Sequence, residues 1–187
     1  MIHRTRIVLA GALAAVLLAP APALASAAPP DSGAPFTMAR EQGHALDCTG
    51  ERNGVHVAVQ LYENSAFGAH ASMAVQTADA EYVGGGETEA GLFHDGTVWH
   101  RLVVEPQDET AGAAQTAVVS GSYAPAGPRR RVDEVHEEPM GPVVVKGWNT
   151  PLAAAVTVRV LGQEVDLTCG DAFAFDLRVW RFDSTGS

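Results

Sequence analysis

Histidines are the side chains in this chain best suited to hold a metal ion or to transfer a proton near neutral pH. Six of them follow the first 25 residues. A zinc site needs three or four ligands within about 2.0–2.3 Å of one ion, and no HxH or HExxH spacing would bring such ligands together. We therefore predict solvent-facing histidines and neither a metal nor a cofactor. The six are His44, His56, His70, His94, His100 and His136.

The other groups that could do chemistry have structural explanations. A serine hydrolase would carry a Gly-x-Ser-x-Gly segment, and the chain has none. Ser120-Gly121-Ser122 lies in an alternating strand pattern, while Gly84-Gly85-Gly86 lacks the dinucleotide-binding spacing and indicates a mobile loop or a bulge. Carboxylates are plentiful, but a glycosidase pair is defined by its separation in space. The sequence thus leans against an enzyme, and a secreted hydrolase with dispersed carboxylates or histidines is kept as an alternative.

The N-terminus carries the features of an export signal. Positive residues at 3–6 precede the uncharged apolar run 7–18, which is shorter than the about 20 residues of a membrane-spanning helix. Signal-peptidase cleavage is predicted after Ala25 or, as a second choice, after Ala27. We expect a cleaved signal helix over residues 1–25, a flexible Pro/Ala-rich tail over 26–37 and a single domain over 38–187, secreted to the extracellular space and free of the membrane.

The charge balance excludes one class of partner. The chain has 12 Lys and Arg against 22 Asp and Glu, a formal charge of −10. Cleavage after Ala25 removes Arg4 and Arg6, which makes the charge −12. Because phosphate neutralisation needs an excess of clustered cations, this acidic protein is not expected to bind nucleic acid.

The remaining sequence has the pattern of an all-β protein. Apolar and polar residues alternate over 55–62 and 69–76, and further short apolar segments recur as far as Phe182. Turn-forming clusters separate them, among them 124–128, 139–142 and 149–151. We predict an antiparallel β-sandwich or an up-and-down (meander) β-barrel of about 8–11 short strands.

Three two-residue turns set the register of hairpins. The position of each turn fixes which residues are paired, and in the resulting registers apolar residues face each other and, in the third hairpin, opposite charges meet. A looser prediction places His70 opposite Gln60 across the 63–67 loop. The turn Asn53-Gly54 pairs Leu46 with Leu61 and Cys48 with Val59, the turn Asp95-Gly96 pairs Phe93 with Val98, and the turn Gly162-Gln163 pairs Val160 with Val165 and Arg159 with Asp166.

The two cysteines are predicted to form a disulfide. Cys48 and Cys169 both fall on the apolar face of their strands, in a chain that carries an export signal. The bridge would join an early strand to a late one. Two cysteines are too few for a four-cysteine zinc site.

One charge run and one aromatic pair are candidates for docking. Arg129, Arg130 and Arg131 precede four carboxylates, a pattern typical of an exposed, solvated connection that could also dock a partner. Trp180 and Phe182 share one face of the last strand, while the other face is also apolar. A central strand or an exposed aromatic patch would have this pattern.

We therefore expect a secreted binding module whose partner is an extracellular protein or a small ligand. Two alternatives are the hydrolase described above and an inhibitor that presents an exposed loop over residues 124–140 to a secreted enzyme. The sequence does not decide between barrel and sandwich, and it names no ligand.

Overall fold

A computed structural model describes residues 36–88, 91–108 and 112–182. This part of the chain is all β, and it contains no helix that could span a membrane. The predicted signal peptide and its cleavage positions lie outside the described residues. The strands are β1 (Phe36–Arg52), β2 (Val55–Asn64), β3 (Gly68–Gln76), β4 (Glu81–Thr88), β5 (Phe93–His94), β6 (Thr97–Pro106), β7 (Gln115–Pro125), β8 (Arg130–Glu138), β9 (Gly141–Val160) and β10 (Gln163–Phe182).

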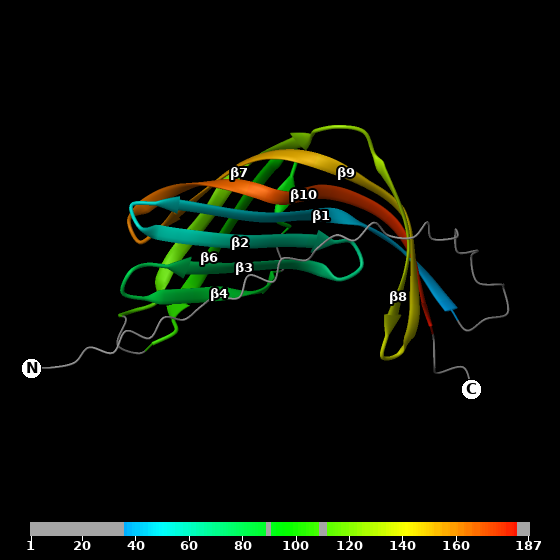
Figure 1. Cartoon of the computed structure of the whole chain (residues 1–187), viewed down its shortest axis with the longest axis horizontal. Coiled ribbons are helices and arrows are strands. Elements are labelled where there is room, and N and C mark those ends of the chain that lie inside the picture. Colours follow the sequence, from blue (N-terminus) through cyan, green and yellow to red (C-terminus); the bar gives the residue numbers. More distant parts are fainter. Residues whose placement is uncertain (1–35, 89–90, 109–111, 183–187) are drawn as a thin grey trace, which may run out of the picture.

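Antiparallel pairing closes the sheet into a barrel. The strands follow the order β1–β2–β3–β4–β6–β7–β9–β10, and β10 pairs again with β1 (Figure 1). The seam between β4 and β6 is the shortest, with two paired positions. Closure removes the open edges that an isolated sheet would leave.

The barrel interior is filled by small branched and aliphatic side chains. Alternate residues of each strand point inward, as the period of two predicts. They include Leu46, Val57, Val59, Leu61, Met73, Val75, Val104, Val119, Val158 and Val165, each at most 3 % exposed.

Beyond one end of the barrel, four strands continue as an open sheet. It consists of β8, residues 141–149 of β9, residues 173–182 of β10 and residues 36–42 of β1, in that order. We call it the flared sheet, and it is the part that bends away below β10 at the right of Figure 1. β1 enters it at Phe36, so the last two residues of the expected tail take part in the sheet.

The strand lengths differ from those predicted. The turn expected at 149–151 does not form, because these residues continue β9 through 20 residues. The charge run at 129–138 was expected as a solvated connection, but residues 130–138 form the strand β8. The exposed loop proposed for an inhibitor is therefore absent, since most of 124–140 is strand.

Two hairpin registers are confirmed and one is wrong. Leu46 lies opposite Leu61, and Phe93 opposite Val98. In the third hairpin the turn residues are Leu161 and Gly162, with φ of 51° and 70°, so every pair is shifted by two positions. Arg159 consequently faces Glu164 instead of Asp166.

The predicted disulfide is present. Cys48 on β1 lies directly opposite Cys169 on β10, and the two are bonded. The register of these strands shifts between Asp47 and Cys48, just beside the bridge. The bond thus ties the barrel together close to the point where β1 and β10 leave it for the flared sheet.

Candidate binding site on the flared sheet

The two faces of the flared sheet differ in how they are covered. The outer face, which continues the outside of the barrel, buries Phe175 and Val179. The end of β2 and the turn that follows it pack on this face. Tyr62 of β2 stacks on Phe175 with ring centroids 5.8 Å apart, and the Arg181 guanidinium lies 5.0 Å from the ring of Phe67 in the turn. This leaves the inner face, which continues the barrel interior, as the accessible one.

Strand register gathers basic and aromatic side chains on the inner face. Directly opposite residues of antiparallel strands project to the same side of a sheet. Three rows therefore cross the inner face. The first is Met38–Trp180–Val144–Val135, the second Arg40–Arg178–Lys146–Asp133, and the third Gln42–Asp176–Trp148–Arg131.

These rows surround a hollow of about 610 Å³. Four of the 12 basic residues of the chain line it, together with two of the three tryptophans. In a protein with an excess of carboxylates, such a gathering of cations creates a local positive potential. The lining residues are Arg40, Arg129, Lys146, Gly147, Trp148, Asp176, Arg178 and Trp180.

Two of the four cations are compensated by carboxylates. Arg40 donates from Nε and Nη2 to the two carboxylate oxygens of Asp176, at 2.9 and 2.8 Å. These hydrogen bonds hold the pKa of Asp176 below its ordinary value, with Arg129 adding electrostatic attraction. Lys146 Nζ lies 3.4 Å from Asp133 Oδ1. Both carboxylates are thus taken up by cations of the same face.

The other two guanidinium groups form no ion pair within the described residues. Arg129 lies over the Trp148 ring, 5.3 Å from its centroid, and Arg178 is exposed. A guanidinium presents several N–H donors in one plane and suits a carboxylate or another anionic group. The hollow therefore offers two positive groups beside indole rings.

Exposed apolar side chains surround the hollow. Met38 is 52 % exposed, Val135 46 %, Trp148 44 % and Phe182 37 %. Tryptophan, methionine and arginine are enriched in protein–protein interfaces. The composition of this face is therefore similar to that of protein–protein interfaces, with basic residues at the centre and apolar residues around them.

The predicted docking residues are distributed over both faces. Arg129 and Trp180 line the hollow, and Phe182 and Arg131 lie on the same inner face. Arg130 pairs with Asn149 and belongs to the outer face. Sequence reasoning missed Arg40, Lys146, Asp176 and Arg178. They alternate with residues that are mostly apolar or small along the parts of β1, β9 and β10 that lie beyond the barrel, which was the available signal. Only the strand register shows that these residues share one face.

The histidine prediction is wrong for two residues. His44 lies at the barrel mouth, stacked on Phe93 with centroids 4.9 Å apart and 5.2 Å from Tyr123. Burial lowers its pKa, and the nearby carboxylate of Glu63 opposes that shift. His100 occupies an inward position on β6, and burial lowers its pKa as well. His70 lies opposite Tyr62, not Gln60.

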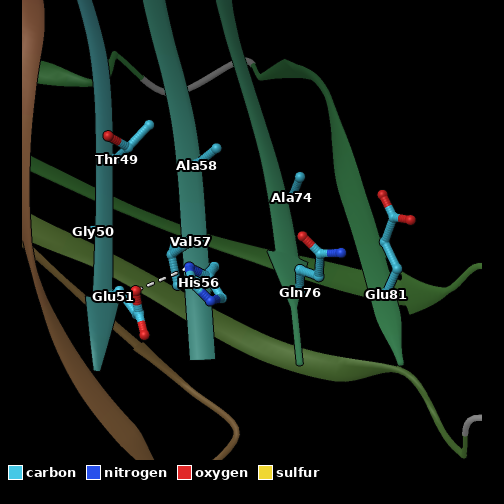
Figure 2. Close-up of a pocket in the computed structure, with 9 residues that line it drawn as sticks. All are labelled: Thr49, Gly50, Glu51, His56, Val57, Ala58, Ala74, Gln76 and Glu81. Atoms are coloured by element: carbon cyan, nitrogen blue, oxygen red, sulfur yellow. Dashed lines mark ion pairs between the residues drawn. The ribbon is translucent and has the colours of Figure 1, made fainter. Parts of the chain in front are cut away.

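A second hollow crosses the outer wall of the barrel. Figure 2 shows its small residues Ala58 and Ala74 in one row, beside a polar row that includes Glu51 and His56. Glu51 Oε2 lies 3.3 Å from His56 Nδ1. Within the described residues, no group of three or more possible ligands could hold a metal ion here or elsewhere. The residues that line this second hollow include no arginine and no lysine.

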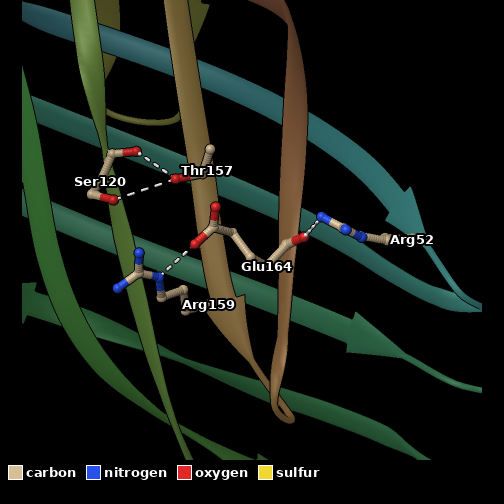
Figure 3. A network of polar contacts seen from close by, with 5 residues as sticks. All are labelled: Arg52, Ser120, Thr157, Arg159 and Glu164. Carbon is tan, nitrogen blue, oxygen red and sulfur yellow. Dashed lines mark hydrogen bonds and ion pairs between the residues drawn. The ribbon is translucent and has the colours of Figure 1, made fainter.

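The far end of the barrel carries a polar network that is remote from the flared sheet. In Figure 3, Arg159 donates to Glu164 at 2.6 Å, and Arg52 donates to the Glu164 carbonyl at 3.0 Å. Thr157 and Ser120 contact each other on the neighbouring strands. These cations are engaged within the barrel wall.

Comparisons with known proteins do not assign the chain to a family. No family model, no curated protein and no solved structure matched the chain.

Proposed function

We propose that the protein is a secreted binding module and that the inner face of the flared sheet binds an acidic segment of a partner protein. The observation that carries the proposal is the hollow, where Arg129 and Arg178 stand beside two tryptophans without an ion-pair partner in the described residues. Secretion rests on the signal-like N-terminus, and the disulfide is compatible with it.

The net negative charge of the protein does not oppose such binding at physiological salt. The Debye length is then about 8 Å, so a bound carboxylate responds mainly to the cations within that radius. The exposed apolar residues around the hollow favour a protein partner over a free anion, because they provide surface that apolar side chains would cover.

A defined peptide tests the proposal. We expect a short peptide of glutamate and leucine to change the tryptophan fluorescence of the protein, and its glutamine-for-glutamate version to bind much more weakly. Substituting Arg178→Ala or Arg129→Ala should raise the dissociation constant roughly tenfold, the value of a charge-assisted hydrogen bond. Arg101→Ala is the matched control, since Arg101 is exposed on β6 and is not part of the hollow.

Three outcomes would contradict the proposal. The glutamine peptide could bind as well as the glutamate peptide, or the two hollow variants could bind like the wild type. An anionic polysaccharide that binds this face more tightly than the peptide would assign the site to a different class of ligand.

A further inference from the structure

The strand β8 has one unpaired edge. It pairs with β9, and no second strand of the described residues pairs with it. Seven of its nine residues are exposed, and only Val132 and Asp133 are covered. An edge of this length offers backbone N–H and C=O groups to another strand.

The charged residues at the two ends of β8 have opposite signs. The strand begins with Arg130 and Arg131 and ends with Glu137 and Glu138. If a second β8 lies antiparallel to the first, centred on Glu134, Arg130 faces Glu138 and Arg131 faces Glu137. Because the arrangement is symmetric, it would bring opposite charges together at four positions, and Arg131 would share its charge between Glu137 of the second copy and Asp133 of its own strand, which lies 3.0 Å away. A parallel arrangement in register would place like charges side by side.

We propose that two copies of this chain form a dimer by antiparallel pairing of their β8 strands. Charged residues normally protect a sheet edge, because pairing brings like charges together. In β8 the charges are segregated by sign, so the same residues favour the antiparallel pair and disfavour the parallel one. A two-fold interface of this kind is self-complementary.

The dimer would join two flared sheets into one sheet of eight strands. The two-fold axis of an antiparallel strand pair is perpendicular to the sheet, so both inner faces lie on the same side. The two hollows would then open in one direction, and a partner with two acidic segments could occupy both. The dimer itself rests on β8 alone and does not depend on the proposed function of the hollow.

One contact at the centre is unfavourable. The axis brings Glu134 of each copy opposite the other, and like charges directly opposite destabilise a pair. Glu134→Gln keeps the shape and removes this repulsion. It should therefore tighten the dimer by a few-fold.

Charge exchange tests the proposal on the purified protein. Sedimentation equilibrium should show a dimer for the wild type, weakened as salt rises from about 0.05 to about 0.5 M. The variant Arg130→Glu/Arg131→Glu should dimerise at least tenfold more weakly, and so should Glu137→Arg/Glu138→Arg. An equimolar mixture of the two should form a heterodimer. The fourfold variant that combines all substitutions should again form a homodimer, because its charges are complementary in the reverse order.

Specific results would overturn the dimer. The proposal is wrong if the wild-type protein stays monomeric at about 1 mM. It is also wrong if the double variants dimerise as tightly as the wild type, or if the mixture of the two double variants does not associate. Circular dichroism of each variant shows whether the β-structure is intact. If the double variants were misfolded, a Glu134→Gln protein that dimerises no more tightly than the wild type would still contradict the proposal. Peptide binding to the hollow is read separately by fluorescence, so the two proposals can fail independently.

Discussion

Arg40 on β1 binds Asp176 on β10 diagonally across the flared sheet, through two hydrogen bonds of 2.9 and 2.8 Å. The residue directly opposite Arg40 is Arg178, a like charge, while Asp176 lies opposite Gln42. The diagonal contact therefore pairs the Arg40 guanidinium with a carboxylate, while the Arg178 guanidinium forms no ion pair with any residue that the structure describes. It connects positions that are 136 residues apart in the sequence.

Removing the charge of Asp176 should strengthen binding of an acidic peptide. Asp176→Asn keeps the size of the side chain but releases Arg40, so the hollow gains one uncompensated cation. We expect a dissociation constant a few-fold lower than that of the wild type in the fluorescence titration. Arg178→Ala changes the constant in the opposite direction. If both substitutions weakened binding, the compensation of charge described here would be wrong.

The disulfide should contribute strongly to stability. It closes a loop over a separation of 121 residues, and removing a native bridge from a small domain typically costs about 2–5 kcal/mol. We expect Cys48→Ala/Cys169→Ala to lower the free energy of unfolding in urea by an amount in this range. Alkylation of the folded protein without reductant should label neither cysteine, and labelling of both would argue against the bridge.

Gly43 should tolerate no side chain. It lies on β1 where β2 separates from it, and a Cβ there would overlap the carbonyl oxygen of Glu63 and lie 2.7 Å from Phe175 Cζ. Gly43→Ala should lower the free energy of unfolding by about 1–3 kcal/mol or more, the cost of overpacking. Gly170→Ala is the control, because a Cβ there meets no atom within 4 Å. Equal urea midpoints for the two variants would contradict the close approach.

The half-buried histidines His44 and His100 should make the stability of the fold depend on pH. Burial lowers the pKa of His44 and of His100, so the unfolded chain binds more protons than the folded one as the pH falls below 6.5. Folding is therefore most favourable above pH 6.5, where both imidazoles are neutral in either state. The free energy of unfolding decreases as the pH falls from 6.5 through the pKa values of the folded state. We expect His44→Phe/His100→Leu to flatten the decline in urea midpoint between about pH 7 and 5. His70→Gln, at an exposed position, should leave the decline unchanged.

The hairpins show where local sequence suffices. Asn53-Gly54 and Asp95-Gly96 form the predicted turns, because both positions of each turn have a positive φ that Asn, Asp and Gly accept. In the third hairpin, Leu161 takes φ of 51°, which local preference disfavours. The outcome is decided by pairing over the length of β9 and β10, where Val158 meets Val165 and Arg159 meets Glu164.

The longest strands show where local sequence fails. Asn149 and Pro151 are turn-forming residues, yet they lie within β9. Pairing with β8 ends at Asn149 and pairing with β7 begins at Leu152, so these residues lie where one edge of β9 changes partner. The turn preference of Asn149 and Pro151 therefore could not predict that β9 continues here and changes its partner from β8 to β7.

By itself, the sequence determined the all-β class, the inward alternation and the pairing of Cys48 with Cys169, because strand periodicity and short turns are local properties. The tertiary structure decided that the sheet closes, that β8 extends it and that Arg40, Arg129, Arg178 and Trp148 meet on one face. Those residues come from four separate segments of the chain. Their proximity depends on the register of long strands, which is set by packing along the whole barrel and not by the residues of the hollow.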